Sequence, residues 1–189
     1  MKLCKLEKDM LPIGPLMIEH RLIDRVIELL ENESRQMRDT NVTNIKFINQ
    51  AVDFLKVYAD RCHHGKEEKI LFKALRAKPL SAQDKDMLEG LINDHIRARL
   101  LVGKISEGVG ENYFKPTSEM TKSIASIIED LTKLYRSHVH KEDKQFFVPA
   151  MNYFSKEEQD NMLCEFWEFD RTLIHEKYKS VVLQLEKGE

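Results

Sequence analysis

Two stretches of the chain decide how it folds: residues 63–75 read HHGKEEKILFKAL, and residues 137–151 read SHVHKEDKQFFVPAM. In each stretch a histidine is followed four residues later by a glutamate, which gives the pairs His63/Glu67 and His138/Glu142. Residues four apart lie on the same face of a helix, one turn from each other. Apolar residues recur on that face at helical spacing, so both stretches predict amphipathic helices that turn a histidine and an acid toward the core.

Few residues interrupt the helical pattern elsewhere in the chain. Glycine and proline number 7 and 5 among 189 residues, a composition typical of long helices rather than sheets. The breaks predict five helices, at about residues 16–37, 44–77, 81–107, 117–147 and 155–186. Four long helices with short connections pack most naturally as an up-down-up-down bundle. We therefore expect an all-α fold, a single domain over residues 1–189 with a bundle core at about 13–153, an N-terminal arm and an extra C-terminal helix.

Local signals set the expected helix ends. Ser155 and Glu158 match a capping box at the start of the fifth helix. Gly108 and Gly110 are expected to end the third helix, and Pro149 is expected to stop the fourth. The polar residues 38–43 are expected to form the first turn.

The composition argues against several classes of protein. The 30 Lys and Arg and 32 Asp and Glu are spread along the chain and give a net charge of -2, so no nucleic-acid partner is expected. No run of about 18 uncharged apolar residues exists, and the first ten residues are charged, so we expect no membrane association and a cytoplasmic protein. Cys4, Cys62 and Cys164 form no CxxC pair and are expected to be reduced thiols. Phosphate-loop, HExxH and nucleophile-elbow motifs are absent, which leaves nucleotide and hydrolase chemistry without support.

Each of the four bundle helices carries one histidine on its apolar face. These histidines are His20, His63, His95 and His138. The other three histidines differ. His64 lies one step of about 100° from His63 on a mostly polar face, and His140 lies among basic residues, so both are expected at the surface. His175 on the fifth helix is expected either at the surface or beside the site.

Six inward-facing side chains are candidate metal ligands: His20, His63, Glu67, His95, His138 and Glu142. A single histidine on an apolar face is usually an ordinary core residue, and one HxxxE is common by chance. The set is different, because burying four imidazoles and two carboxylates without a cation would leave charge unpaired at a cost of several kcal/mol. Nitrogen and oxygen ligands without thiolate suit iron, manganese or zinc, and two acids that can bridge favour a dinuclear centre. We expect two iron ions, with manganese or zinc less favoured.

The same segments carry a family likeness. IEHRLIDRVIELL (18–30), HHGKEEKILFKAL (63–75), NDHIRARLLV (93–102) and SHVHKEDKQFFVPAM (137–151) resemble the metal-binding helices of hemerythrin-like HHE cation-binding proteins, over about residues 13–153. The resemblance implies a diiron centre in which Glu67 and Glu142 bridge two irons and the four histidines supply terminal nitrogens. It also implies that an oxo or hydroxo bridge, solvent or dioxygen fills the remaining positions.

One departure from the family pattern bears on function. Oxygen-carrying hemerythrins have a fifth histidine in an HxxxH pair on the third helix, whereas Arg99 and Leu91 stand four residues after and before His95. A missing nitrogen would leave one iron with an extra open position and favour irreversible reaction with oxygen or peroxide over reversible carriage. Tyr58 and Tyr135 are expected either as hydrogen donors near the centre or as packing residues.

Three functions are compatible with these observations. The first is a non-haem diiron protein that binds or reacts with dioxygen, peroxide or nitric oxide, in sensing, scavenging or iron handling. The second is a weak diiron peroxidase or oxidase. The third is a metal-free helical interaction module whose histidines merely pack. The sequence names no catalytic residue and no protein partner.

Overall fold

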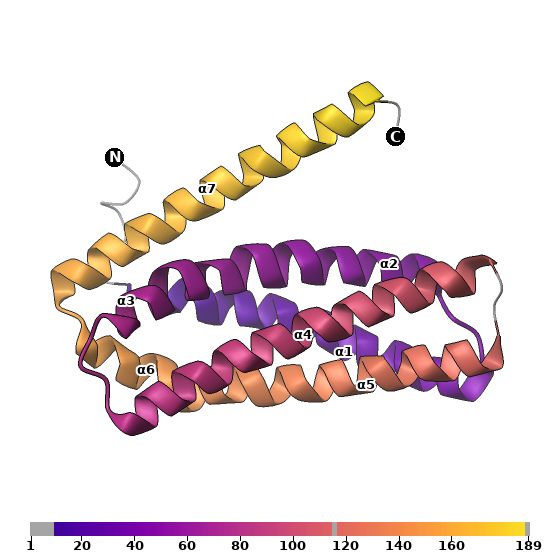
Figure 1. Ribbon diagram of the computed structural model, residues 1–189, viewed down its shortest axis with the longest axis horizontal. Coiled ribbons are helices and arrows are strands. Elements are labelled where there is room, and N and C mark those ends of the chain that lie inside the picture. Colours follow the sequence, from indigo (N-terminus) through magenta and orange to yellow (C-terminus); the bar gives the residue numbers. More distant parts are fainter. Residues whose placement is uncertain (1–9, 115–116, 188–189) are drawn as a thin grey trace.

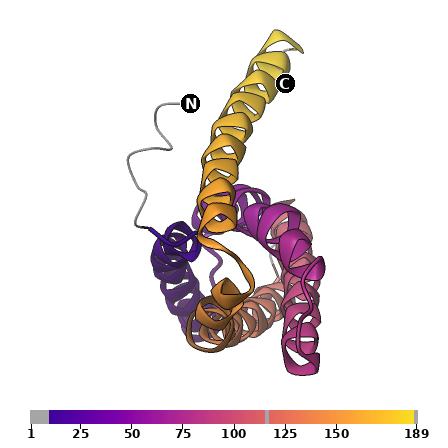
Figure 2. The same ribbon diagram turned by 90° about the vertical axis from the view of Figure 1, so that its left-hand side faces the viewer.

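Helix accounts for every regular element of the described chain, as the sequence predicts. The computed structural model describes residues 10–114 and 117–187, with the side chains of residues 111–114 and 174–187 outside the description. Four helical rods run alternately up and down (Figure 1), and the view along them shows the rods around a common centre (Figure 2). The all-α up-down-up-down bundle is therefore confirmed.

Two of the rods are single helices and two are composite. The first rod is α1 (Ile13–Thr40) and the third is α4 (Ala82–Phe114). The second rod joins α2 (Ile45–Phe54), η2 (Leu55–His64), η3 (Glu67–Leu71) and α3 (Phe72–Arg76). The fourth rod joins α5 (Ser118–Lys141), η4 (Glu142–Phe146), α6 (Phe147–Ala150) and the 3₁₀ turn η5 (Met151–Tyr153). The expected extra helix is α7 (Lys156–Lys187).

The composite rods differ from the regular α-helices that the sequence predicts. Segments η2, η3 and η4 are π-helical, with wider turns than an α-helix. Such turns are rare and occur often at functional sites. Here they coincide with the two HxxxE segments, since His63 lies in η2, Glu67 begins η3 and Glu142 begins η4.

Three expected helix ends are wrong by several residues. The first helix runs to Thr40, where Asn41 in a left-handed conformation (φ 55) donates its N–H to the Met37 carbonyl. The third helix passes through Gly108 and Gly110 to Phe114. A Cβ on Gly108 would lie 3.1 Å from Ile124 Cγ1, so Gly108 allows α4 to pack closely on α5 rather than ending the helix.

The fourth rod likewise continues past its predicted end. Pro149 is the third residue of α6, which begins at Phe147. Proline is tolerated in a first turn because the N–H groups there have no partner within the helix. The predicted capping box is confirmed: Ser155 N–H donates to Glu158 Oε2 at 2.8 Å, and Glu158 N–H donates to Ser155 Oγ at 3.3 Å.

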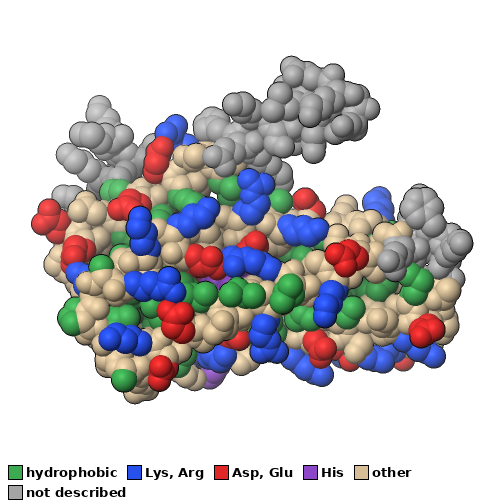
Figure 3. Space-filling view, in the orientation of Figure 1, with side chains coloured by type: hydrophobic (Ala, Val, Ile, Leu, Met, Phe, Trp, Pro, Cys, Tyr) green, Lys and Arg blue, Asp and Glu red, His purple; other side chains and the backbone are tan. Residues whose placement is uncertain are grey.

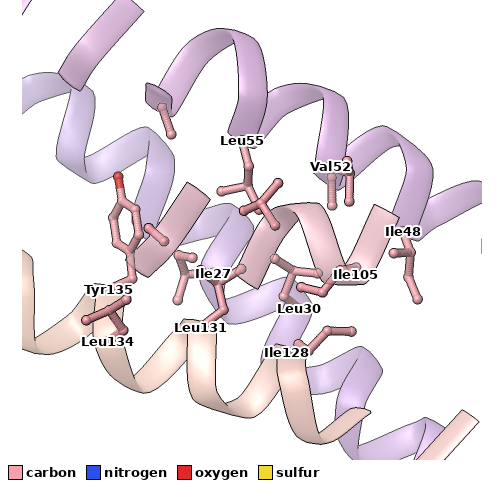
Figure 4. Packing of buried hydrophobic residues seen from close by; sticks show 14 of the residues in the cluster. Ile27, Leu30, Ile48, Val52, Leu55, Ile105, Ile128, Leu131, Leu134 and Tyr135 are labelled. Atoms are coloured by element: carbon pink, nitrogen blue, oxygen red, sulfur yellow. The ribbon is translucent and has the colours of Figure 1, made fainter. Parts of the chain in front are cut away.

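The core consists of two apolar clusters with a polar layer between them. The first cluster fills the bundle toward the α1–α2 turn (Figure 4) and includes Ile27, Leu30, Leu55, Ile105 and Leu131. The second lies toward the opposite end and includes Leu16, Phe72, Leu91, Phe147 and Phe166. Along each rod the predicted ligands stand between residues of the two clusters, so apolar side chains shield them from water on both sides.

Helix α7 docks its first half on the second cluster and then leans away from the rods (Figure 2). Phe166 and Met162 are buried in that contact. Among the described residues, no helix combines the length and apolar composition needed to cross a membrane. The cysteine prediction holds for Cys62, a free thiol, and is wrong for Cys164, which is disulfide-bonded; Cys4 lies outside the described residues.

Candidate metal centre

All six predicted ligands meet in the polar layer. Their side chains are at most 3% exposed, and they come from all four rods: His20, His63, Glu67, His95, His138 and Glu142. Because each rod presents its ligand on the face that its apolar residues also occupy, packing the rods brings the six together. The helical periodicity of the sequence therefore placed every one of these side chains correctly with respect to the core.

The ligands form two groups that share an acid. In the first, His20, His63, Glu67 and Glu142 each offer an atom within 4.8 Å of the others. His20 Nε2 lies 2.9 Å from His63 Nε2 and 3.1 Å from Glu142 Oε2. Two nitrogens held about 2.1 Å from one ion at a right angle would be about 3 Å apart, so this spacing fits a shared metal.

The second group contains a histidine that the sequence placed at the surface. His64, Glu67, His95 and His138 also offer atoms within 4.8 Å of one another. His95 Nε2 lies 3.1 Å from His138 Nε2 and 3.4 Å from Glu67 Oε2. Glu142 reaches this group as well, because its Oε2 lies 3.2 Å from His138 Nε2. Both acids therefore stand between the two groups, where a bridging carboxylate would be.

The surface prediction for His64 is wrong. Its side chain is 3% exposed, its ring stacks on His95 at 3.8 Å, and its Nε2 has no hydrogen-bond partner. The prediction assumed the 100° step of an α-helix, but His64 ends the π-helical η2, where wider turns make each step smaller. His63 and His64 consequently both face inward. His140 is exposed as predicted, and the His175 side chain lies outside the described residues.

A second set of carboxylates contacts the Nδ1 atoms of the histidines, on the side of each ring away from the two ligand groups. His20 Nδ1 lies 2.8 Å from Asp143, His63 Nδ1 2.9 Å from Glu19, and His95 Nδ1 2.7 Å from Glu68. His138 Nδ1 lies farther, 3.8 Å, from Asp94. Metal-bound histidines commonly donate their other ring N–H to a carboxylate, which fixes the tautomer and leaves Nε2 free for the metal. The set therefore has the outer partners that a metal centre needs.

Sequence reasoning missed these four acids, although a signal was present. Each one stands next to a ligand in the chain, in the pairs Glu19–His20, Glu67–Glu68, Asp94–His95 and Glu142–Asp143. Glu19, Glu68 and Asp143 each support a histidine on a neighbouring rod rather than their own neighbour in the sequence, and Asp94 lies near His138 without a hydrogen bond. An acid adjacent to four of the six candidate ligands, one on each rod, could have been recognised as a second pattern.

One acid of this set is joined to α7 through a buried lysine. The Lys66 side chain is fully buried, and its Nζ pairs with Glu19 and lies 2.9 Å from the Asp170 carboxylate on α7. Burial raises the pKa of Glu19, but His63 and Lys66 outweigh it and hold that pKa below its usual value. Glu19 is thus an ionised link between a candidate ligand and the extra helix.

The electrostatics of the layer are arranged around Glu142. Burial opposes protonation of His20, but its hydrogen bond to Asp143 and the charge of Glu142 raise its pKa to about 10. Burial is likewise outweighed at His138, where the charge of Glu142 raises the pKa to about 10. Burial would raise the pKa of Glu142, yet the two histidines hold it well below its usual value.

The remaining ligands are held in neutral forms. Burial and the charge of Glu142 raise the pKa of Glu67 well above its usual value. Burial lowers the pKa of His63 to about 4 and also lowers those of His64 and His95. The two oxygens of Glu67 have no hydrogen-bond partner, and Glu142 has only ion-pair contacts, the shortest with His20 and His138. Buried carboxylate oxygens without donors are costly, and divalent cations would satisfy them, so the residues present fit a metal.

Comparison with known proteins agrees with this geometry. The family model described as the hemerythrin HHE cation binding domain matches residues 11–150, which include all the candidate ligands. No curated protein and no solved structure matches the chain.

Proposed function

Because the chain belongs to the hemerythrin HHE cation-binding family, we propose that it is a non-haem diiron protein that binds or reacts with dioxygen, peroxide or nitric oxide. Such a protein would act in sensing, scavenging or iron handling. The observation that carries the proposal is the pair of buried ligand groups that share Glu67. Two groups with a common acid match the donor arrangement of a dinuclear centre.

The ligands divide between the two ions in this proposal. His20 and His63 would hold one iron, and His64, His95 and His138 would hold the other, with Glu67 and Glu142 bridging. When bound, the irons supply a redox-active centre with affinity for small oxygen- and nitrogen-containing ligands. The chain's part is to orient the imidazoles through the Nδ1 contacts to the outer acids, and to keep water out with the apolar clusters.

His64 changes the weight of the alternatives. The peroxidase or oxidase alternative was motivated by an open position left by a missing fifth histidine. His64 offers a nitrogen beside His95 and His138 and could fill that open position. We therefore favour binding of a small ligand over peroxidase or oxidase activity. The metal-free interaction module is less favoured, because it leaves the oxygens of Glu67 buried without hydrogen-bond partners.

The direct test is metal analysis of protein purified from iron-replete cells. We expect about two irons per chain and absorption from an oxo-bridged ferric pair. Glu67→Ala, which removes the shared acid, should lower the content below about one iron per chain. The exposed His140→Ala variant is the control and should retain the full content. Wild-type protein with less than about one iron per chain and no such absorption would defeat the proposal.

The assignment of His64 has its own test. His64→Ala should leave one iron more accessible, so the reduced protein should be oxidised by air faster than the wild type, and its spectrum should change. His140→Ala again serves as the control. If His64→Ala has the spectrum and oxidation rate of the wild type, His64 is not a ligand, while the six-residue centre still stands.

A further inference from the structure

A cavity of about 130 Å³ lies between η2, α4 and α5, beside the metal centre and outside the set of iron ligands apart from His64. Its walls are mostly apolar, with Leu55, Ala59, Ala98, Val102 and Leu131 among the lining residues. Figure 4 shows Leu131 and Tyr135 pointing from α5, and Leu55 pointing from the opposite rod, into the space between the rods. The cavity is therefore a pocket in the first apolar cluster that reaches the edge of the polar layer.

Charged side chains mark the outer part of the cavity. Lys56, Asp60 and Arg99 line it and are each partly or fully exposed. Arg99 donates to Asp60 and Glu68 at 2.7 Å, and Lys56 donates to Ser106 at 2.9 Å. Each of the three charged groups thus has a polar partner, and Figure 3 shows both signs mixed around apolar side chains on this face of the molecule. No excess of one charge selects an ionic ligand.

The inner part of the cavity carries two polar groups without a hydrogen-bond partner, the Tyr135 hydroxyl and His64 Nε2, and His64 is assigned to the metal in the proposed function. Tyr135 lines the cavity, is 3% exposed, and its hydroxyl has no hydrogen-bond partner. Leaving a buried hydroxyl without a partner costs free energy that a ligand oxygen would recover. His64 also lines the cavity, and its stacking on His95 joins the cavity to the centre.

The size of the cavity limits what can occupy it. Apolar cavities of about 150 Å³ hold a single benzene molecule. The volume here is slightly smaller, about 130 Å³, and still much larger than a diatomic gas requires. The fitting occupant is one small ring or a branched chain of a few carbons.

We propose that this cavity binds a small apolar molecule with one hydroxyl group, a simple alcohol or phenol, whose oxygen pairs with the Tyr135 hydroxyl and whose apolar body contacts Leu55, Ala98 and Val102. The bound molecule lies against His64, next to the centre. Binding itself uses no metal. The binding site can therefore be tested independently of the diiron function. Only a change in the iron spectrum when the cavity is filled would depend on that function.

Calorimetric titration of the metal-free protein with phenol, and with toluene as a probe of similar size without oxygen, tests the proposal. Phenol should bind more tightly than toluene by roughly fivefold, the usual gain from one hydrogen bond. Tyr135→Phe should remove that preference and leave toluene binding unchanged.

Filling the cavity provides the second test. Gly103 lines the cavity, and a Cβ built on it meets no atom within 4 Å, so Gly103→Leu should fold and abolish binding of both probes. Gly90→Leu is the matched control, since Gly90 lies on the same helix, has equal room for a Cβ and does not line the cavity. Equal affinity for phenol and toluene in the wild type would refute the role of Tyr135. Wild-type binding by Gly103→Leu, or no binding of either probe to the wild-type protein, would refute the site.

Discussion

Replacing Lys66 by methionine tests how tightly α7 and the centre are connected. Lys66 is fully buried, yet its ammonium group has two acidic partners, Glu19 from α1 and Asp170 from α7. Methionine keeps most of the apolar stem and removes the charge. Glu19 would then retain only the His63 Nδ1–H as a partner, at 2.9 Å, and Asp170 would retain only the weak thiol donor of Cys62, at 3.2 Å.

The magnitude follows from the burial of the three groups. Breaking a fully buried ion pair costs about 3–5 kcal/mol. The side chains of Glu19 and Asp170 are 12% and 29% exposed, so solvent compensates part of the loss, and the lower limit of about 3 kcal/mol applies. A chain of this length loses roughly 2–4 °C in Tm per kcal/mol, which predicts a fall of about 6–12 °C for metal-free Lys66→Met.

Denaturant unfolding of the metal-free protein, followed by circular dichroism, measures this effect. Lys73→Met is the control, because Lys73 is exposed on the same rod, and its stability should stay within about 0.5 kcal/mol of the wild type. Since Glu19 orients His63, Lys66→Met should also weaken metal binding, by roughly tenfold. A loss of less than about 1 kcal/mol, with unchanged metal affinity, would show that the buried ammonium does not couple α7 to the centre.

Two further predictions concern protons and an unpaired hydroxyl. Metal binding at neutral pH should release at least two protons, one each from His20 and His138, whose pKa is about 10. Glu67 should release a further proton, because its pKa is well above the usual value in the metal-free protein. The affinity for metal should therefore rise with pH up to about 10. The metal-free protein should show the opposite trend: the stability that these two histidines contribute is fully present below their ordinary pKa of 6.5 and is lost as the pH rises toward 10. Calorimetry in buffers of different ionisation enthalpy counts the protons, and pH-independent affinity would contradict the charge arrangement. Tyr135→Phe should leave the free energy of unfolding unchanged or raise it by about 1 kcal/mol, because the Tyr135 hydroxyl has no partner. Tyr153→Phe removes the acceptor for the Ser81 N–H and should lower the free energy of unfolding by about 1 kcal/mol. Equal losses in the two variants would contradict this reasoning.

The bundle and its six ligands were predictable because both depend on one property of the sequence. Helical periodicity assigns His20, His95 and the two HxxxE pairs to the same faces as the apolar residues. Burial of those faces then fixes the direction of the ligands, whatever the local details of each helix. For this reason the ligands were placed correctly even though three helix ends were not.

The errors occurred where tertiary packing overrides local preference. Gly108 was expected to end a helix, but its lack of a Cβ permits the close approach of Ile124, and this contact keeps α4 continuous. His64 was assigned to the surface because an α-helical step was assumed, and no feature of a single sequence reports that η2 is π-helical. The cavity beside Tyr135 was equally inaccessible, since it depends on the space left between three packed helices.

The outer acids indicate why the centre and the bundle should form together. Asp143 follows Glu142 on the fourth rod and binds His20 on the first, and Glu19 precedes His20 and binds His63 on the second. Each rod therefore supplies a ligand to the centre, and the first, second and fourth rods also supply a hydrogen-bonded support to a ligand of another rod. A shift of one rod along its neighbours would misplace a ligand and break a support at once, so the two sets of contacts specify a single register. Because a bound metal would add to the stability of that register alone, its removal should loosen all four rods together rather than one helix at a time.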